Sequence, residues 1–261
     1  MTGLVGLRRA ATTSAESVVA APAGLVVTGV FYLMVTSILA GLWSAAAAAT
    51  GGEIVGYSAA ALVWYIATSE ASVITIPVRL IEDAGDDVGS GRVDVELLRP
   101  VSLLWLRVAR EAGAVAPRIG VCAVIGVVFA SLVAGPAPSG GALALTALAL
   151  PLAALTNVVA QHAFAGASFW IRDAKGAWFL YQKLVFVLGG MLIPLEVLPG
   201  WLETVAKVLP FMAMAYVPAR LASGHVEPEL IALQAGWLVA ISVGAAWVFA
   251  AGERRLIGSG S

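Results

Sequence analysis

Residues 230–250 read LIALQAGWLVAISVGAAWVFA, a run that contains no charged side chain. A helix of about 20 apolar residues is long enough to cross the hydrocarbon core of a bilayer. The rest of the chain has the same character, because 60% of its 261 residues are apolar and only 12% are charged. The mean hydropathy is +0.94, whereas a soluble domain carries about 25% charged residues. We therefore expect an all-α polytopic membrane protein with a single domain over residues 1–257, followed by a short Gly-Ser tail, 258–261, left by cloning.

Six apolar runs of this kind predict six transmembrane helices, at residues 24–45, 54–76, 119–134, 142–164, 178–195 and 230–250. Membrane proteins keep an excess of Lys and Arg in their cytoplasmic loops. With both termini in the cytoplasm, all 15 lysines and arginines except Lys207 and Arg220 fall on the inside. Two cytoplasmic termini also require an even number of spans, which agrees with six.

Residues 10–23 are rich in Ala and Ser and precede the first span. They predict a helix that lies along the cytoplasmic membrane surface, and the alternative is a frayed terminus. The loop 79–118 is long for a compact bundle, and long ordered loops are often contact sites. Its acidic, glycine-containing first part predicts turns, and the amphipathic stretch after Pro100 predicts a surface helix that leads into the third span.

The segment 194–224 lies on the outer side and is apolar, but prolines interrupt it at 194, 199, 210 and 218. No full span fits between these prolines. We expect short extracellular re-entrant helices, which membrane proteins tolerate where the backbone packs in protein or lines a cavity.

Polar side chains inside predicted spans are the first candidates for a substrate path. They are Glu70 in the second span and Asn157, Gln161 and His162 in the fourth. One interpretation is the polar lining of a cavity open to the cytoplasm, in which the acid could pair with the amides and the imidazole. The other is a set of satisfied hydrogen bonds between helices. Both predict side chains that point into the bundle.

The last span also carries a row of small residues spaced four apart, which permits close approach of another helix. That helix could belong to this chain or to another. The residues of the row are Ala232, Gly236, Ala240 and Gly244.

Several classes of function are excluded or disfavoured by the residues. The net charge of −1 offers no basic surface for nucleic acid. One cysteine and two distant histidines leave no metal site to expect. Phosphate-loop, HExxH and GxSxG motifs are missing. We therefore predict no catalytic residue, no metal and no cofactor in this chain.

Four strings, in this order and spacing, resemble the permease subunits of bacterial ATP-binding-cassette transporters of the type-2 exporter class. The loop string GRVDVELLRP is similar to that family's G-x-hydrophobic-D-x-x-L-L-x-R-P pattern, although here no residue separates Leu98 from Arg99. The resemblance covers roughly residues 20–250 and is closest to small six-span permeases that work with a second permease and a separate ATPase. The strings are 91–100, Phe169-Trp170, GMLIPL at 190–195 with Leu198-Pro199, and LPF at 209–211 with Pro218 downstream.

The resemblance implies ATPase partner subunits that bind ATP and Mg²⁺, and a second permease chain that we expect to differ from this one. It implies a multi-pass protein of the bacterial cytoplasmic membrane. It also implies a short coupling helix within 81–94 that docks on the ATPase, for which acidic residues suit a charged soluble surface. The candidate coupling residues are Glu82, Asp83, Asp86, Asp87, Arg92 and Asp94.

Two other functions remain open at this point. One is a stand-alone secondary transporter, coupled to protons or ions, that uses Glu70 as its ion site. The other is a membrane assembly subunit that does not transport, which the small-residue row would suit.

Overall fold

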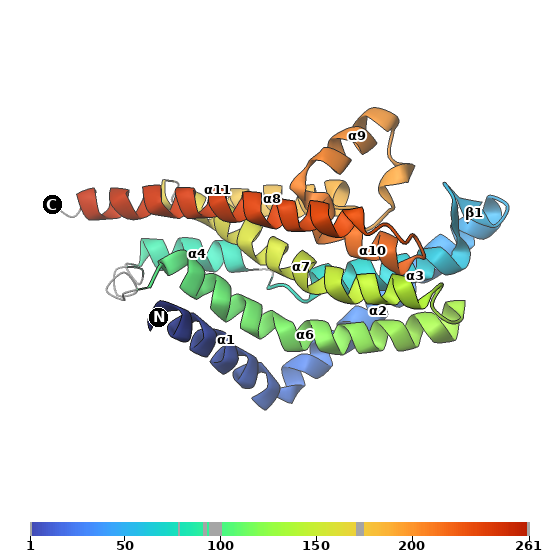
Figure 1. Ribbon diagram of the computed structural model, residues 1–261, viewed down its shortest axis with the longest axis horizontal. Helices are drawn as coiled ribbons and strands as arrows, with labels where there is room; N and C mark the ends of the chain where they lie inside the picture. The colour runs from blue at the N-terminus through green and yellow to red at the C-terminus, as the bar shows by residue number, and fades with distance from the viewer. Residues whose placement is uncertain (1, 78, 91–92, 94–100, 171–174, 260–261) are drawn as a thin grey trace.

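The computed structural model describes residues 2–77, 79–90, 93, 101–170 and 175–259. Its helices run along the long axis of an elongated bundle (Figure 1). Both termini and α4 (Leu80–Gly89) lie at one end, called here the terminal end. The hairpin of β1 (Glu53–Ile54) and β2 (Tyr57–Ser58) lies at the other, called the hairpin end.

Four of the described helices are long and apolar enough to cross a membrane, and they contain the first, third, fourth and sixth predicted spans. The surface helix predicted before the third span is not separate from it, since one helix runs from Leu103 to Ala134. They are α2 (Pro22–Ala49), α6 (Leu103–Ala134), α7 (Gly140–Ala165), which continues into η1 (Gly166–Phe169), and α11 (Glu229–Ser259). The helices of the second and fifth predicted spans are shorter: α3 (Ala59–Ile74) and α8 (Lys175–Leu188).

The predicted start of the second span at residue 54 is wrong. A β-hairpin occupies residues 53–58, with Glu53 opposite Ser58, and its turn includes Gly56 at φ +85°. The helix begins only after Ser58, whose Oγ accepts a hydrogen bond from the backbone N–H of Ala61 at 3.2 Å. At 1.5 Å per residue, α3 is about 24 Å long, shorter than a bilayer core of about 30 Å.

The predicted end of the fifth span at residue 195 is also wrong, since α8 ends at Leu188. Two glycines follow, and Gly190 has φ +67°. The Tyr65 hydroxyl donates to the carbonyl of Gly190 at 2.5 Å, and the Tyr216 N–H donates to the carbonyl of Gly189 at 2.8 Å. These two bonds satisfy carbonyls that a longer helix would use itself.

The next residues form four short helical segments, as the prolines predicted. They are η2 (Leu195–Val197), α9 (Gly200–Val208), η3 (Pro210–Met214) and α10 (Tyr216–Ala222).

The acidic part of the loop is a helix, α4, and not the turns predicted from its glycines. Glu82 and Asp83 lie in its first turn, where negative charge favours a helix. The buried side of α4 carries Leu80, Ile81 and Ala84. This 3–4 spacing is that of an amphipathic helix, so packing outweighs the glycine in its middle.

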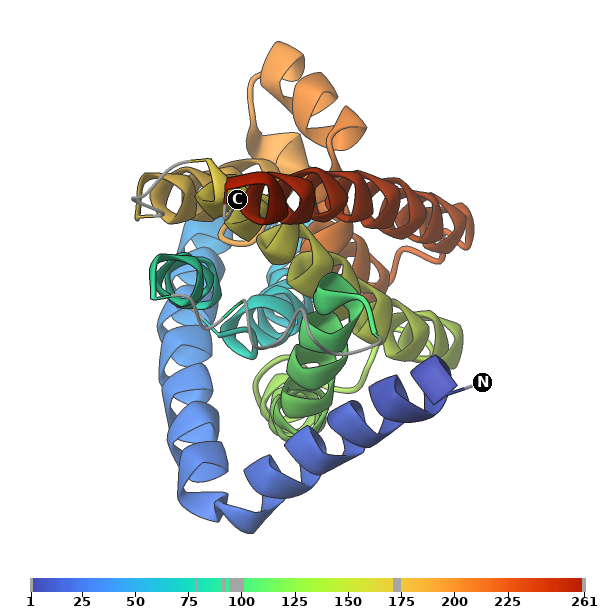
Figure 2. The ribbon, with the colours of Figure 1, turned by 90° about the vertical axis from the view of Figure 1, so that its left-hand side faces the viewer.

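The N-terminal segment forms α1 (Thr2–Ala20), so the alternative of a frayed terminus is wrong. The helix is interrupted at Ala21, which lies between α1 and α2. From there α1 folds back and lies across α6 (Figure 2). The helices approach closely at Gly113 of α6, where a Cβ atom would overlap the backbone of Ala11. Pro117 lies one turn further along α6, which continues through it as one helix.

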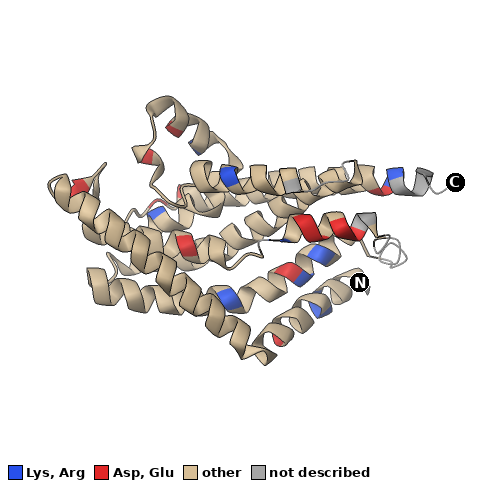
Figure 3. Ribbon diagram, turned by 180° about the vertical axis from the view of Figure 1, so that it is seen from behind, with Lys and Arg blue, Asp and Glu red and all other residues tan. Residues whose placement is uncertain are grey.

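Burial is concentrated in α3, where every residue from 62 to 72 is buried, and in α7. The outer sides of α2, α6 and α11 instead expose large apolar side chains, such as Val30 at 64%, Leu132 at 81% and Trp247 at 70%. Most charged residues lie toward the two ends of the bundle, and a few lie along its middle (Figure 3). A soluble monomer rarely exposes so much apolar surface, whereas a bilayer requires it.

The small-residue row of α11 faces away from the rest of this chain. Its four residues are exposed, and a Cβ added to Gly236 or Gly244 would meet no described atom within 4 Å. The sequence left open whether the helix that packs on this row belongs to this chain or to another. The described part of this chain provides no such helix.

Candidate functional site

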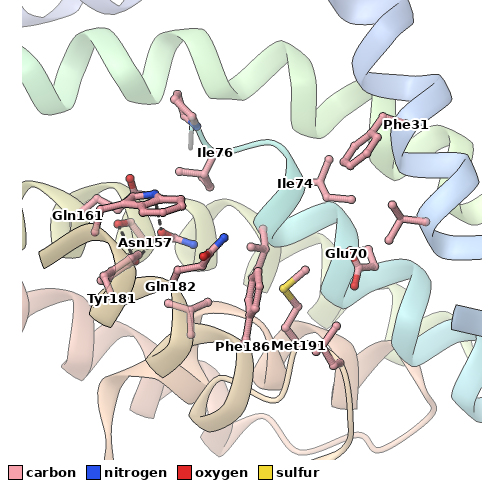
Figure 4. A pocket seen from close by; sticks show the side chains of 16 residues that line it. Phe31, Glu70, Ile74, Ile76, Asn157, Gln161, Tyr181, Gln182, Phe186 and Met191 are labelled. Atoms are coloured by element: carbon pink, nitrogen blue, oxygen red, sulfur yellow. Dashed lines mark hydrogen bonds between the residues drawn. The ribbon is translucent and has the colours of Figure 1, made fainter. Parts of the chain in front are cut away.

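A cavity of about 390 Å³ lies between α2, α3, α7 and α8 (Figure 4). Its wall is mostly aliphatic and aromatic, with Phe31, Trp178 and Phe186 among the lining residues. Phe31 is 51% exposed, so the cavity reaches the molecular surface beside α2. Pockets that hold small molecules are typically apolar, measure about 300–1,000 Å³ and contain a few polar groups.

Glu70 of α3 supplies the charged side chain of this cavity. The residue is 0% exposed, and neither of its carboxylate oxygens has a hydrogen-bond partner among the described residues. Burying an unpaired carboxylate is costly, and such residues in membrane proteins mark functional sites by default. The alternative of satisfied hydrogen bonds therefore does not describe Glu70.

The amides of α7 form a second polar group in the same cavity. Gln161 Nε2 donates to Asn157 Oδ1 at 3.2 Å, and the Tyr181 hydroxyl of α8 donates to the same oxygen at 2.6 Å. Gln161 Oε1 has no partner within the described ranges. Glu70 lies at the opposite end of the cavity from Asn157 and Gln161, so the acid does not pair with the amides in this structure (Figure 4).

His162 does not line the main cavity. Its Nδ1 lies 2.8 Å from the carbonyl oxygen of Val158, and its ring faces a cleft of about 170 Å³ beneath α4 that Asp87 and Arg107 also line. Glu70, Asn157 and Gln161 thus line one cavity, at opposite ends of it, and His162 lies elsewhere.

Sequence reasoning missed the contribution of α8 to the cavity. Trp178, Tyr181, Gln182 and Val185 all line it. Their spacing of three, four and seven residues places them on one face of a helix. That spacing is a usable signal, but these residues carry no charge that would have drawn attention to them.

The helix α4 is fixed to the bundle by an ion pair and by packing. Arg107 Nη2 of α6 lies 3.0 Å from Asp87 Oδ2, with the two side chains 12% and 29% exposed. Ile81 and Ala84 belong to one buried cluster with Tyr181 and Val185, which also line the cavity. The apolar side of α4 is therefore in the same packed cluster as the cavity wall.

The other coupling candidates differ in position. Asp83 and Asp86 are exposed and Glu82 is half-buried. Arg92 and Asp94 lie outside the described residues.

A second polar cluster at the hairpin end, the hairpin-end network, consists of Tyr57, Glu196, Tyr216, Arg220 and Glu227. Arg220 Nε and Nη2 donate to Glu227, the latter at 2.7 Å, while its Nη1 donates to Tyr57 Oη and to Glu196 Oε1, each at 2.8 Å. Tyr216 Oη donates to Glu196 Oε1 at 2.5 Å. The hydrogen bonds from Arg220 hold the pKa of Glu227 below its ordinary value. The network joins β2, η2 and α10 to the segment before α11.

Within the described ranges, no group of three or more His, Cys, Asp or Glu side chains is placed to hold a metal ion. The sequence model of a family described as "ABC-2 family transporter protein" matches residues 19–260. The chain belongs to this ABC-2 family. Neither a curated protein nor a solved structure matches it.

This ABC-2 permease is thus a multi-pass membrane component of an ATP-binding-cassette transporter, and membership in the family implies ATPase partners. The match begins at residue 19, so nearly all of α1 precedes it.

Proposed function

We propose that this ABC-2 permease is the membrane-spanning subunit of an ATP-driven exporter. It forms the substrate path with a second permease chain and is powered by separate ATPase subunits, which bind ATP and Mg²⁺. The observation that carries the proposal is the shared packing of α4 and the cavity wall through Ile81, Ala84, Tyr181 and Val185.

In this proposal the terminal end faces the cytoplasm, and the chain crosses the bacterial inner membrane six times with α3 and α8 as short spans. The exposed acids of α4 contact the ATPase, since a charged surface gives such a contact its register. A displacement of α4 moves Arg107 of α6 through the ion pair with Asp87. It also presses on Tyr181, which holds Asn157 in the cavity.

At the hairpin end, α9 and α10 form the extracellular re-entrant helices that close the path. Their short helices could not cross a bilayer, since α9 has 9 residues and α10 has 7. The hairpin-end network supports this role because Arg220 ties α10 to β2 and to the residues before α11.

Affinity purification of this chain from its native membrane in mild detergent, followed by mass spectrometry, tests the proposal. We expect an ATPase subunit and a second, different permease in the eluate. Recovery of the ATPase with this permease alone would instead indicate a homodimer. Consistent absence of an ATPase would refute the exporter and favour the secondary transporter based on Glu70.

Three charge-reversal variants, two on α4 and one control on the hairpin, locate the ATPase contact. Reversing the exposed charges of α4 with Asp83→Lys and Asp86→Lys should reduce ATPase recovery several-fold. Glu53→Lys, an equally exposed reversal on the hairpin at the opposite end, should leave recovery unchanged. Equal recovery from all three variants would place the contact elsewhere.

A further inference from the structure

The cavity between α2, α3, α7 and α8 has a chemical polarity that points to a class of ligand. Its buried side-chain atoms that lack a hydrogen-bond partner among the described residues are Glu70 Oε1, Glu70 Oε2 and Gln161 Oε1. All three are acceptors when Glu70 is ionised. A ligand that satisfies them must bring donors or positive charge.

The two polar ends are separated by apolar wall. Ile74 and Phe186 lie between Glu70 at one end and Asn157 and Gln161 at the other (Figure 4). Aromatic faces attract cations that are held within about 6 Å of the ring, and Phe31, Trp178 and Phe186 all line the cavity. The wall therefore suits an apolar body that carries a positive charge.

We propose that this cavity binds the exported substrate, and that the substrate is an amphiphilic organic cation. Its positively charged nitrogen or phosphorus centre lies against Glu70, its apolar body lies along Phe186 and Ile74, and a second polar group, where one exists, reaches Gln161. The carboxylate then gains the counter-charge that the described part of the chain does not give it. That the cation is exported rests on the proposed function, whereas its binding to the cavity needs no ATPase.

Direct binding to the purified full-length chain tests the proposal without nucleotide. The probe is tritiated tetraphenylphosphonium in a scintillation-proximity assay, and labelled tetraphenylborate, of equal shape and opposite charge, is assayed in separate samples because the two ions precipitate each other. We expect saturable binding of tetraphenylphosphonium and no saturable binding of tetraphenylborate. Absence of saturable tetraphenylphosphonium binding, or equal binding of the anion, would overturn the proposal.

The isosteric variant Glu70→Gln removes the charge and keeps the volume. Because a charge-assisted contact in a buried site is lost, tetraphenylphosphonium affinity should fall about ten-fold or more. Glu53→Gln, on the exposed hairpin, should bind as the unaltered chain does. Unchanged affinity in Glu70→Gln would overturn the assignment, and the thermal unfolding of each variant verifies that it is folded.

The two proposals fail separately. An ATPase that co-purifies with a chain unable to bind tetraphenylphosphonium would leave the exporter standing and remove the cationic substrate. Binding that depends on Glu70 in a chain that never associates with an ATPase would keep the cation site and remove the exporter.

Discussion

Replacing Arg220 by Met should destabilise the hairpin end of this permease more than any single surface ion pair could. The guanidinium donates to Tyr57, Glu196 and Glu227 and is only 18% exposed. Its removal leaves Glu227, 31% exposed, without the guanidinium, and leaves Glu196, 17% exposed, with the longer 3.7 Å contact to Lys207.

Exposed ion pairs contribute about 0–1 kcal/mol, whereas removing one partner of a buried pair costs about 3–5 kcal/mol. The partial exposure places Arg220→Met between these limits, at about 2–4 kcal/mol. In a chain of this size, 1 kcal/mol shifts the unfolding temperature by about 2–4 °C. A decrease of at least about 4 °C is therefore expected.

The chain supplies its own probe for this measurement. Cys122 is its single cysteine, and it is a free thiol with 0% exposure. A thiol-reactive dye that fluoresces on coupling therefore reports unfolding in detergent. Arg79→Ala serves as control, because its side chain is 71% exposed and its ion pairs with Glu82 and Asp83 at the terminal end should be worth less than about 1 kcal/mol. An unfolding temperature for Arg220→Met within about 1 °C of the unaltered chain would refute the reasoning.

Three further predictions follow from the described contacts. Gly113→Leu places a side chain into the backbone of α1, so α1 should separate from α6 and become a site of limited proteolysis; protection equal to that of the unaltered chain would contradict the packing. Arg107→Asp places a second carboxylate beside Asp87 and should lower substrate-dependent ATP hydrolysis in the assembled transporter about ten-fold or more. The double variant Arg107→Asp with Asp87→Arg should restore this activity. Absence of restoration would contradict the role of the ion pair. The pKa of Glu227 is lowered in the folded state, so the ionised carboxylate stabilises the fold fully above its ordinary pKa of about 4.5, and this stabilisation is lost as the pH falls below that value. Below pH 4.5 the unfolding temperature should therefore decline more steeply in the unaltered chain than in Glu227→Gln. Parallel curves would contradict this.

The four long spans could be predicted from the sequence because length and apolar character are sufficient to define them. The two short spans could not be placed as well. The start of α3 depends on the hairpin turn at Gly56, and the end of α8 depends on hydrogen bonds from Tyr65 and Tyr216, which come from distant parts of the chain. Apolar residues continue past both boundaries, so hydropathy alone extends the helices too far.

The candidate site was partly predictable for the same reason. Glu70, Asn157 and Gln161 stand out as polar residues in apolar spans, and the structure places all three in one cavity. The separation of Glu70 from the two amides could not be predicted, because it depends on the end of the cavity at which each helix places its polar side chain. The hairpin-end network draws on separate segments, from Tyr57 to Glu227, and has no local spacing that would reveal it.

The crossing of α1 over α6 has a mechanical consequence. Pro117 has no N–H, so it cannot donate a hydrogen bond to the carbonyl of Gly113 one turn earlier, and α6 lacks one backbone hydrogen bond there. Gly113 is also where the backbone of α1 lies against α6. The N-terminal helix thus reinforces α6 between Gly113 and Pro117, the turn where it bends most easily, about 15–21 Å from the start of α6 at Leu103. The bending stiffness of α6 at this turn decides how much of a displacement at the terminal end is transmitted to the half of α6 that follows Pro117.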